Sequence, residues 1–335
     1  MMSLNSKRSI IAKVFCIIVV LGCTTIGQAT ENDSLLEINK GQINVAKICR
    51  WKGGVSACVN LSFDDNNISA CQIAKILDQY GYKGTFFFNT YECLFPDSVV
   101  EIGERMHEIG NHTFSHNRFT QDVDSATIDF EIRKSKEILE NVFGIKCVSF
   151  AEPGHVRSDI GTQLIFKYHL FCRNYSEYID VEQVRLPFSQ LTTKQLSSSL
   201  NDAMRKGVFL KLSGHGIDGD GYLPTKRDFL LEVLDTLKSL NDKGKIWITT
   251  LKDGSLYENL YYEISLNQSM QGDTLLLTFD DFNKNKYEDF LSCPISVEIP
   301  SYYCEDVICL TKKINVIKRQ DRFILTMDLM RDSVF

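Results

Sequence analysis

The alternation of apolar patterns between about residues 57 and 250 is the feature that most constrains the fold of this chain. Short runs typical of buried strands alternate with longer amphipathic runs typical of helices. The expected strands are 57–63, 84–89, 146–153, 207–215 and 245–250, and the expected helices are 67–81, 97–110, 124–144 and 226–244. Such alternation predicts an α/β domain with a mainly parallel sheet, either open or closed as a barrel.

The texture of the sequence changes after about residue 256. Strand-like runs with turn residues between them follow one another to the end of the chain, at 261–267, 273–279, 293–300, 312–319 and 322–329. We therefore predict a first domain over residues 51–255 and a small all-β C-terminal domain over 256–335. Residues 30–50 are polar and weakly patterned, so we interpret them as a leader into the first domain.

The first thirty residues have the pattern of an export signal. Lys7, Arg8 and Lys13 precede an apolar run, and Gly27-Gln28-Ala29 offers a small-x-small cleavage site. The pattern predicts a signal peptide over residues 1–29. An alternative is a lipid anchor at Cys23, because "VLGC" resembles a bacterial lipobox. Either interpretation predicts a periplasmic, cell-surface or secreted protein, whose link to a membrane is at most that anchor.

Composition excludes some classes of partner and site. The net charge of −6 argues against nucleic acid, because phosphate binding needs a basic face. Eleven cysteines are many, and nine lie beyond the signal region. They fit either disulfides or buried thiols that pack as small apolar groups. The lack of a Cys-x-x-Cys pair argues against a cysteine zinc site.

Polar side chains gather where the expected strands end. They are Asp64, Asp65, His112, His116, Glu152, His155 and His215. Parallel α/β folds build their sites at the C-terminal ends of strands, where the loops converge. We therefore expect these side chains to lie together. By contrast His107, inside an expected helix, and His169, in an aromatic-rich stretch, are expected to be structural.

Three segments resemble the motifs of the polysaccharide deacetylase family, the NodB-type carbohydrate esterases. Ser62-Phe63-Asp64-Asp65-Asn66 is similar to T-F-D-D-G, and His112-Thr113-Phe114-Ser115-His116 matches H-[ST]-x-x-H. Leu212-Ser213-Gly214-His215 resembles the late L-x-H motif with one residue more. The resemblance covers about residues 51–255 and implies a distorted (β/α) barrel. The order and intervals of the motifs also suit the family.

The resemblance implies one divalent metal ion, Zn²⁺, held by Asp65, His112 and His116, with Asp64 as general base. Two histidines and a carboxylate with an open position are a ligand set of catalytic zinc, which lowers the pKa of bound water to about 7. Attack of that water on an N-acetyl or O-acetyl group of a carbohydrate would release acetate, with His215 protonating the leaving group. Pro153 and His155 are the expected substrate contacts.

The third family motif departs from its pattern. The family shows an R-x-P-Y type segment, whose arginine tunes the base aspartate, whereas this chain has Phe150-Ala151-Glu152-Pro153-Gly154-His155. Arg157, Arg173 and Arg185 are the alternatives that could supply the charge from elsewhere. The missing arginine leaves a glycan-binding pseudoenzyme as an alternative to a deacetylase. Amide hydrolysis on a small non-sugar substrate and a structural cell-surface module are further alternatives, and the oligomeric state stays open.

A second copy of the first motif occurs late in the chain. "LLLTFDDFN" at 275–283 is closer to T-F-D-D than the segment around Asp64. It follows every histidine and no helix-strand unit comes after it. We therefore interpret Asp280 and Asp281 as part of a turn between strands of the C-terminal domain.

Overall fold

The computed structural model describes residues 14–19, 44–91, 97–156, 158–175, 184–271, 274–303, 308–309 and 314–330. The chain divides into two compact units. One unit is Val55–Ser255, and the other is formed by the segments on either side of it. The first unit thus begins four residues after the start expected from the sequence.

The unit Val55–Ser255 is built on an eight-stranded parallel sheet, as the alternation of the sequence predicts. Its strands are β3 (Ala57–Asp64), β4 (Thr85–Phe88), β5 (Glu108–Asn111), β6 (Ser149–Phe150), β7 (Phe171–Cys172), β8 (Val184–Pro187), β9 (Phe209–Gly214) and β10 (Ile246–Thr249). The order is β7-β6-β5-β4-β3-β9-β8, and β10 pairs with the first half of β3. Because β9 lies along one side of β3, β10 and β4 share its other side.

The sheet is curled into a distorted barrel rather than open and flat. Arg173 directly follows β7, yet its guanidinium donates to Ser62 Oγ at 3.2 Å and to Asp64 on β3. In a flat sheet four strand spacings, about 19 Å, would separate β7 from β3. One side chain cannot cross that distance, so the contact requires the sheet to curve round on itself. The expected barrel is confirmed.

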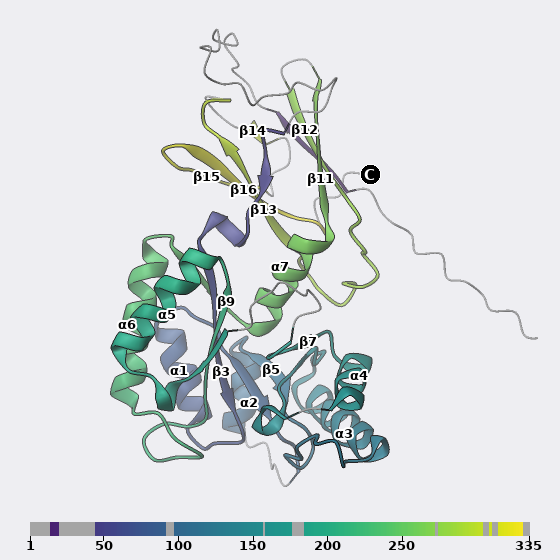
Figure 1. The fold of residues 1–335 in the computed structure, drawn as a ribbon, viewed down its shortest axis with the longest axis vertical. Coiled ribbons are helices and arrows are strands. Elements are labelled where there is room, and N and C mark those ends of the chain that lie inside the picture. Colours follow the sequence, from purple (N-terminus) through teal and green to yellow (C-terminus); the bar gives the residue numbers. More distant parts are fainter. Residues whose placement is uncertain are drawn as a thin grey trace, which may run out of the picture. The chain divides into compact units, whose positions relative to one another are not determined.

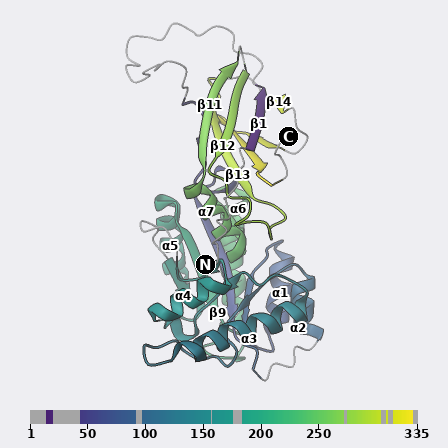
Figure 2. The same cartoon turned by 90° about the vertical axis from the view of Figure 1, so that its right-hand side faces the viewer.

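Six helices surround this sheet. They are α1 (Ala70–Gln79), α2 (Asp97–Glu104), α3 (Ser125–Phe143), α4 (Asp159–Tyr168), α5 (Thr193–Lys206) and α6 (Arg227–Asp242). Figure 1 shows α5 and α6 side by side near β9, while α3 and α4 pair beyond β7. In Figure 2, α1, α2 and α3 follow one another along the unit. Three short 3-10 turns occur in the described chain: η1 (Lys52–Gly54), η2 (Pro153–His155) and η3 (Phe188–Gln190).

Strand β3 separates the apolar core from a polar barrel interior. All eight of its residues are buried. Val59, Leu61 and Phe63 belong to the apolar core that the sheet shares with its helices. Asn60, Ser62 and Asp64 alternate with them and therefore face the other way. This inward face requires polar partners, because a buried polar group without a hydrogen bond is costly.

The expected helix over 97–110 is wrong in its second half. Helix α2 ends at Glu104, Met106 takes a left-handed φ of 64°, and Glu108–Asn111 form strand β5. Parallel pairing of β5 with β4 overrides the helical pattern. Gly110 does not end a helix. A Cβ on it would lie 2.4 Å from the Phe87 ring, so this strand position needs a glycine.

The second unit contains two four-stranded antiparallel sheets. One has the order β11-β12-β1-β14 and the other β15-β16-β13-β2. Their strands are β1 (Val14–Val19), β2 (Lys47–Ile48), β11 (Ser265–Gln271), β12 (Thr274–Asp280), β13 (Pro294–Pro300), β14 (Ile308–Cys309), β15 (Asn315–Lys318) and β16 (Arg322–Asp328). The all-β texture expected after residue 256 is thus present from β11 onward.

Two segments of this unit differ from the sequence expectation. Helix α7 (Leu251–Glu263) covers the first part of the run 261–267, because Leu256, Tyr257 and Leu260 bury one helix face. Residues 44–50, expected to be part of a leader, and 51–54, expected to begin the first domain, both belong to the β unit. Strand β2 pairs with β13, and the buried Trp51 ring lies 6.1 Å from that of Tyr257.

The N-terminal and cysteine expectations are only partly covered by the described residues. Residues 14–19, inside the expected signal peptide, form β1, while Cys23, the cleavage site after Ala29 and residues 30–43 lie outside the described chain. The signal peptide stays a prediction. Six described cysteines are buried free thiols: Cys49, Cys58, Cys71, Cys147, Cys172 and Cys293. Among the described helices, none has the length and apolar character needed to cross a membrane.

Helix α5 offers a test of this fold. Thr192 caps it through a reciprocal capping box: its Oγ1 accepts from Gln195 N at 3.3 Å, and the Gln195 side chain accepts from Thr192 N at 2.9 Å. We expect Thr192→Ala to lower the free energy of unfolding by about 1 kcal/mol, because an orphan helix N–H loses its acceptor. Urea unfolding followed by circular dichroism measures the change. Thr192→Ser retains the acceptor and is the control. Equal losses in both variants would contradict the cap.

Candidate metal and catalytic site

The C-terminal ends of the parallel strands bring the side chains of the sequence motifs into one pocket. Asp64 ends β3, His112 directly follows β5, and His215 directly follows β9. The pocket has a volume of about 620 Å³. Its lining includes Asp64, Asp65, His112, His116, Arg118, His155, Arg185, His215 and Tyr222. The structure therefore brings together Asp64, Asp65 and the four expected histidines, whereas Glu152, also expected there, is buried outside the lining.

Three of these side chains form a cluster with the donor atoms of a metal site. Asp65, His112 and His116 each offer one ligand atom, and these atoms lie within 4.8 Å of one another. The Nε2 atoms of His112 and His116 lie 3.7 Å and 3.4 Å from Asp65 Oδ1. Ligand atoms at the corners of a zinc tetrahedron stand about 3.3 Å apart, given metal–ligand distances near 2.0–2.1 Å. The spacing fits a small divalent metal such as zinc.

The surroundings of His112 also fit a metal ligand. Its Nδ1 lies 2.7 Å from the carbonyl oxygen of Ala151, a contact that places a proton on Nδ1 and leaves the Nε2 lone pair toward Asp65. Burial lowers the pKa of His112, against the opposing effect of the Asp64 and Asp65 carboxylates. A neutral imidazole with one fixed tautomer is the form that binds a metal.

Two buried side chains hold the loop that carries His112 and His116. Asn111 Oδ1 accepts from Thr113 N at 2.8 Å, and its Nδ2 donates to Ile132 O on α3 at 2.9 Å. Glu131, also on α3, accepts from Ser115 N at 2.8 Å and from the Ser115 hydroxyl at 2.5 Å. The two histidines are thus not neighbours on a helix face. They lie on a short loop whose shape is set by the long helix behind it.

Several residues of the site have an unusual backbone conformation. Asp65, Thr113, His116 and His155 have φ of 68°, 71°, 61° and 58°. The left-handed region is costly for residues other than glycine, and more so for a β-branched residue such as Thr113. Such strain persists where the surrounding structure enforces it, and it concentrates at functional sites. The contacts of Asn111 and Glu131 supply that enforcement for the histidine loop.

The structure shows which arginine replaces the one that the third motif lacks. Arg173 Nη1 lies 2.5 Å from Asp64 Oδ1, and Nη2 lies 2.7 Å from Oδ2, so the pair is bidentate. Both side chains are buried. The parallel register pairs Phe150 with Cys172, which puts Arg173, directly after β7, beside Ala151, directly after β6. The charge absent from the third motif is supplied one strand further along the sheet.

This ion pair determines the protonation of Asp64. Burial alone raises the pKa of a carboxyl group, but the charge and hydrogen bonds of Arg173, together with the nearby His112 and His215, outweigh it and lower the pKa. Asp64 is therefore ionised at neutral pH. Arg157, another of the alternatives considered for this role, lies outside the described residues, and Arg185 bonds Ser213 instead.

His215 lies on the opposite side of the Asp65 carboxylate from the two other histidines. Its Nε2 is 3.8 Å from Asp65 Oδ2, whereas His112 and His116 approach Oδ1. Its ring packs edge-on against Tyr222, with ring centroids 5.3 Å apart. One nitrogen of His215 thus faces the metal cluster from across the pocket.

The third-motif segment contributes differently from the sequence expectation. Pro153 is buried and begins the turn η2, whereas Gly154 and His155 line the pocket. His155 Nδ1 lies 3.2 Å from Asn174 Nδ2. Burial and the positive charges of Arg185 and Arg173 lower the pKa of His155 to about 4, so its ring is neutral. Pro153 therefore shapes the turn that presents His155.

Sequence reasoning missed the other side chains of the pocket wall. Arg118 follows His116 by two residues, and Tyr222 lies in the glycine-rich loop after His215. Their short sequence separation from His116 and His215 could have identified them as candidates for the pocket wall. The sequence indicated Arg185 only as an alternative partner for Asp64, and its place in the pocket wall was missed because β8 lies in a stretch without a clear pattern. His107 and His169 are buried outside the lining, as expected.

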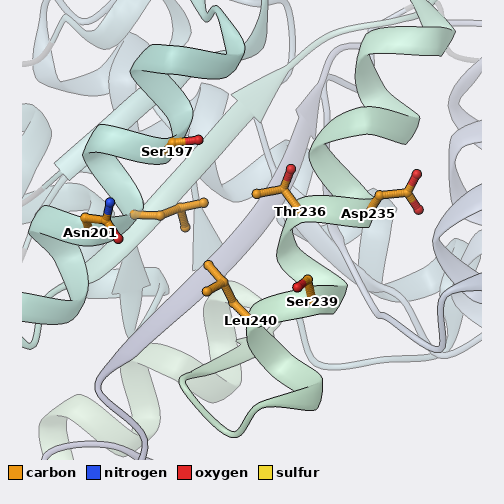
Figure 3. A pocket seen from close by; sticks show the side chains of 7 residues that line it. Ser197, Asn201, Asp235, Thr236, Ser239 and Leu240 are labelled. Carbon is orange, nitrogen blue, oxygen red and sulfur yellow. The ribbon is translucent and has the colours of Figure 1, made fainter.

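A second hollow lies between α5 and α6, on the outside of the barrel. Figure 3 shows its polar rim of small side chains: Ser197, Asn201, Asp235, Thr236 and Ser239. Asp235 accepts a hydrogen bond from Tyr80 OH at 2.8 Å. The hollow brings together no cluster of histidines or carboxylates. The chemistry of the described residues is concentrated in the pocket at the strand ends.

Comparison with known proteins agrees with the motifs. The model of the family described as "Polysaccharide deacetylase" matches residues 53–165. A curated protein described as a gellan lyase, from a Bacillus species, is 28% identical over 120 residues. That match spans 35% of this chain and only 5% of the relative, so the chain covers a small part of that protein's length.

Three solved structures are similar at low identity. A peptidoglycan N-acetylglucosamine deacetylase (Bc1960) is 18% identical, with a TM-score of 0.46, over 60% of this chain and 88% of that one. A family 4 carbohydrate esterase from Streptomyces lividans is 20% identical, with a TM-score of 0.44, over 58% and 91%. A pseudoenzyme of the same family from Bacillus anthracis is 18% identical, with a TM-score of 0.41, over 59% and 65%.

The family model begins just before β3 and ends within α4, so it includes the aspartate pair and both histidines of the metal cluster. The motifs read from the sequence and the family model thus agree on the same residues. The segment 53–165, which carries the proposed metal ligands, belongs to the polysaccharide deacetylase family.

Proposed function

We propose that this protein is a metal-dependent deacetylase that removes N-acetyl or O-acetyl groups from a polysaccharide or oligosaccharide. The observation that carries the proposal is the meeting, in one pocket, of an Asp-His-His cluster with an ionised aspartate held by a buried arginine. The N-terminal pattern of residues 1–29 supports action outside the cytoplasm. Acetate release from acetylated glycans by the purified, metal-loaded chain is the direct test.

Asp65, His112 and His116 would hold the metal, for which Zn²⁺ is the best match of donor set and spacing. A divalent metal bound there supplies Lewis-acid polarisation of the acetyl carbonyl and makes water a stronger nucleophile near neutral pH. The remaining steps fall to side chains of this chain.

Asp64 is the general base. It is ionised, and although Arg173 binds both of its oxygens, each oxygen retains a lone pair that can accept a proton from the attacking water. The new C–O bond forms as that proton reaches Asp64. His215, across the Asp65 carboxylate, donates a proton to the departing nitrogen or oxygen as its bond to the acetyl carbon breaks. Acetate and an amino sugar, or a sugar hydroxyl, result.

The pseudoenzyme alternative has one specific observation in its favour, the departure of the third motif from R-x-P-Y. The position of Arg173 weakens that argument, because the bidentate contact with Asp64 exists without the motif arginine. We therefore favour turnover. The variants below distinguish the two functions.

Metal content tests the ligand assignment. We expect the purified wild-type protein to carry about one divalent ion per chain after loading with Zn²⁺, and His112→Ala to lose it, because two remaining ligands hold zinc weakly. Inductively coupled plasma mass spectrometry measures the content. His155→Ala, which removes a histidine from the same pocket but not from the cluster, should retain the ion. Equal metal contents in all three proteins would refute the assignment.

The Asp64→Asn substitution separates catalysis from metal binding. We expect kcat for acetate release to fall about 10²- to 10⁴-fold, since an amide cannot take the proton of water. The metal content should stay at the wild-type level, because Asp64 is not in the cluster. If wild type and Asp64→Asn released acetate alike across a broad glycan panel, the pseudoenzyme interpretation would replace ours.

Arg173 has a positioning role that acts through Asp64. We expect Arg173→Gln to lower kcat/KM about 10- to 100-fold, as loss of a supporting contact commonly does. It should also lower the free energy of unfolding by about 3–5 kcal/mol, because a buried carboxylate loses its partner. Rescue of kcat/KM by Arg173→Lys, measured on refolded protein of normal metal content, separates positioning from simple structural damage. A fall in stability with unchanged kcat/KM would contradict the role.

A further inference from the structure

Two arginines of the pocket have no part in the mechanism above. Arg118 belongs to the loop that carries His116, and Arg185 belongs to β8. Both line the same pocket as the metal cluster. Since they come from different segments of the barrel, their presence in one cavity is not the result of a single basic stretch in the sequence.

The Arg118 side chain is exposed, but its position is fixed by packing against Gly154. Its guanidinium lies on the backbone of Gly154, where a Cβ would come within 2.6 Å of Nε and 3.0 Å of Cζ. Gly154 has a φ of 63°, so a side chain there is disfavoured twice. Within the described part of the chain, the Arg118 guanidinium makes no hydrogen bond or ion pair, and only its backbone carbonyl accepts one, from Thr120 N. Its charge is therefore available to a ligand in the pocket.

Arg185 is half-buried and anchored at one end. Its Nε donates to Ser213 Oγ at 2.8 Å, which fixes the plane of the guanidinium. The two terminal nitrogens have no partner among the residues that the structure describes. Burial and the neighbouring charge of Arg173 lower the pKa of Arg185 to about 10, which still leaves it protonated at neutral pH. A fixed, protonated fork without a carboxylate partner is suited to a planar anion.

The acids of the pocket do not satisfy these two arginines. The lining, as far as the structure describes it, contains two carboxylates, Asp64 and Asp65. Asp64 is occupied by Arg173, and Asp65 belongs to the metal cluster. With a divalent metal bound, the pocket wall carries an excess of positive charge. A neutral glycan would not neutralise that positive charge, whereas the negative charge of an acidic glycan would be complementary to it.

We infer that the preferred substrate is an anionic glycan, in which a sugar carboxylate lies on or next to the acetylated unit, and that Arg118 and Arg185 recognise this carboxylate. The inference rests on the proposed deacetylase function and specifies its substrate class. The carboxylate can belong to a neighbouring uronate or to the acetylated sugar itself. Both arrangements present the same planar anion to an arginine fork.

The test uses matched substrates that differ only in charge. Hyaluronan oligosaccharides place a uronate beside an N-acetyl sugar, and O-acetylated oligogalacturonates carry acid and acetyl group on one sugar. Each is compared with its own methyl ester, on the full chain loaded with Zn²⁺. We expect kcat/KM for at least one acid to exceed that for its ester about tenfold, with each arginine contributing about threefold. High salt should reduce this ratio.

Variants connect the preference to the two arginines. Arg118→Gln and Arg185→Gln should each reduce the acid-to-ester ratio to within about threefold of unity, because each removes one charge-assisted contact. Arg133→Gln is the charge-matched control. Arg133 lies on α3, outside the pocket lining, and pairs with Asp129 at 3.6 Å, so its loss should leave the ratio unchanged. A ratio near one in the wild type, or one that both pocket variants preserve, would overturn the inference.

The failure of this inference is distinguishable from failure of the proposed function. Hydrolysis of 4-nitrophenyl acetate, an uncharged probe, reports the chemistry without the carboxylate. If that ester is cleaved and acids and methyl esters react alike, the deacetylase stands and the anionic preference is wrong. If no substrate is cleaved, the proposed function fails. Isothermal titration calorimetry then tests whether the pocket still binds anionic glycans more tightly than uncharged ones. Tighter binding of the acids than of their esters supports the inference, and equal binding refutes it.

Discussion

The bidentate contact between Arg173 and Asp64 is the interaction on which the rest of the site depends. It crosses the barrel interior from the end of β7 to the end of β3, and so it requires the curl of the sheet. Neither charge could be buried alone, because an unpaired ion in a protein interior is costly. The pair therefore maintains an ionised carboxylate beside the metal cluster, at a place where burial would otherwise neutralise it.

The pair is possible because β3 has two different faces. Its odd-numbered side chains from Val59 to Phe63 are apolar and pack in the core, while Asn60, Ser62 and Asp64 point into the barrel. Asn60 donates to Thr85 Oγ1 at 3.0 Å, and Ser62 accepts from Arg173 at 3.2 Å. The inner face is thus a continuous row of polar groups, each of which makes at least one hydrogen bond, although Asn60 Oδ1 has no partner among the described residues. Asp64, the proposed general base, is the last member of this row, at the end of the strand.

The sequence allowed a correct prediction where the signal was local and repeated. The alternation of strands and helices predicts the parallel sheet, and the family resemblance implies both its closure as a distorted barrel and the grouping of Asp65 with His112 and His116. Arg173 could not be chosen from three candidates, since its role follows from the register of β6 and β7 rather than from any motif. The helix expected over 97–110 was too long, because pairing with β4 outweighed the helical pattern around Gly110. Non-local contacts decided each of these cases.

The two Phe-Asp-Asp segments show how much local sequence can determine. Asp65 and Asp281 both take a left-handed φ, of 68° and 65°, so the same tripeptide makes the same bend after a strand. Their partners differ. Asp280 accepts from Asn267 and Asp281 from Ser265, both on the adjacent antiparallel strand β11, and those hydrogen bonds join the end of β12 to the beginning of β11. Asp64 and Asp65 meet an arginine and two histidines from strands that the chain reaches only later. A parallel topology brings such distant loops together at one end of the sheet, and this is why the first segment joins the candidate site.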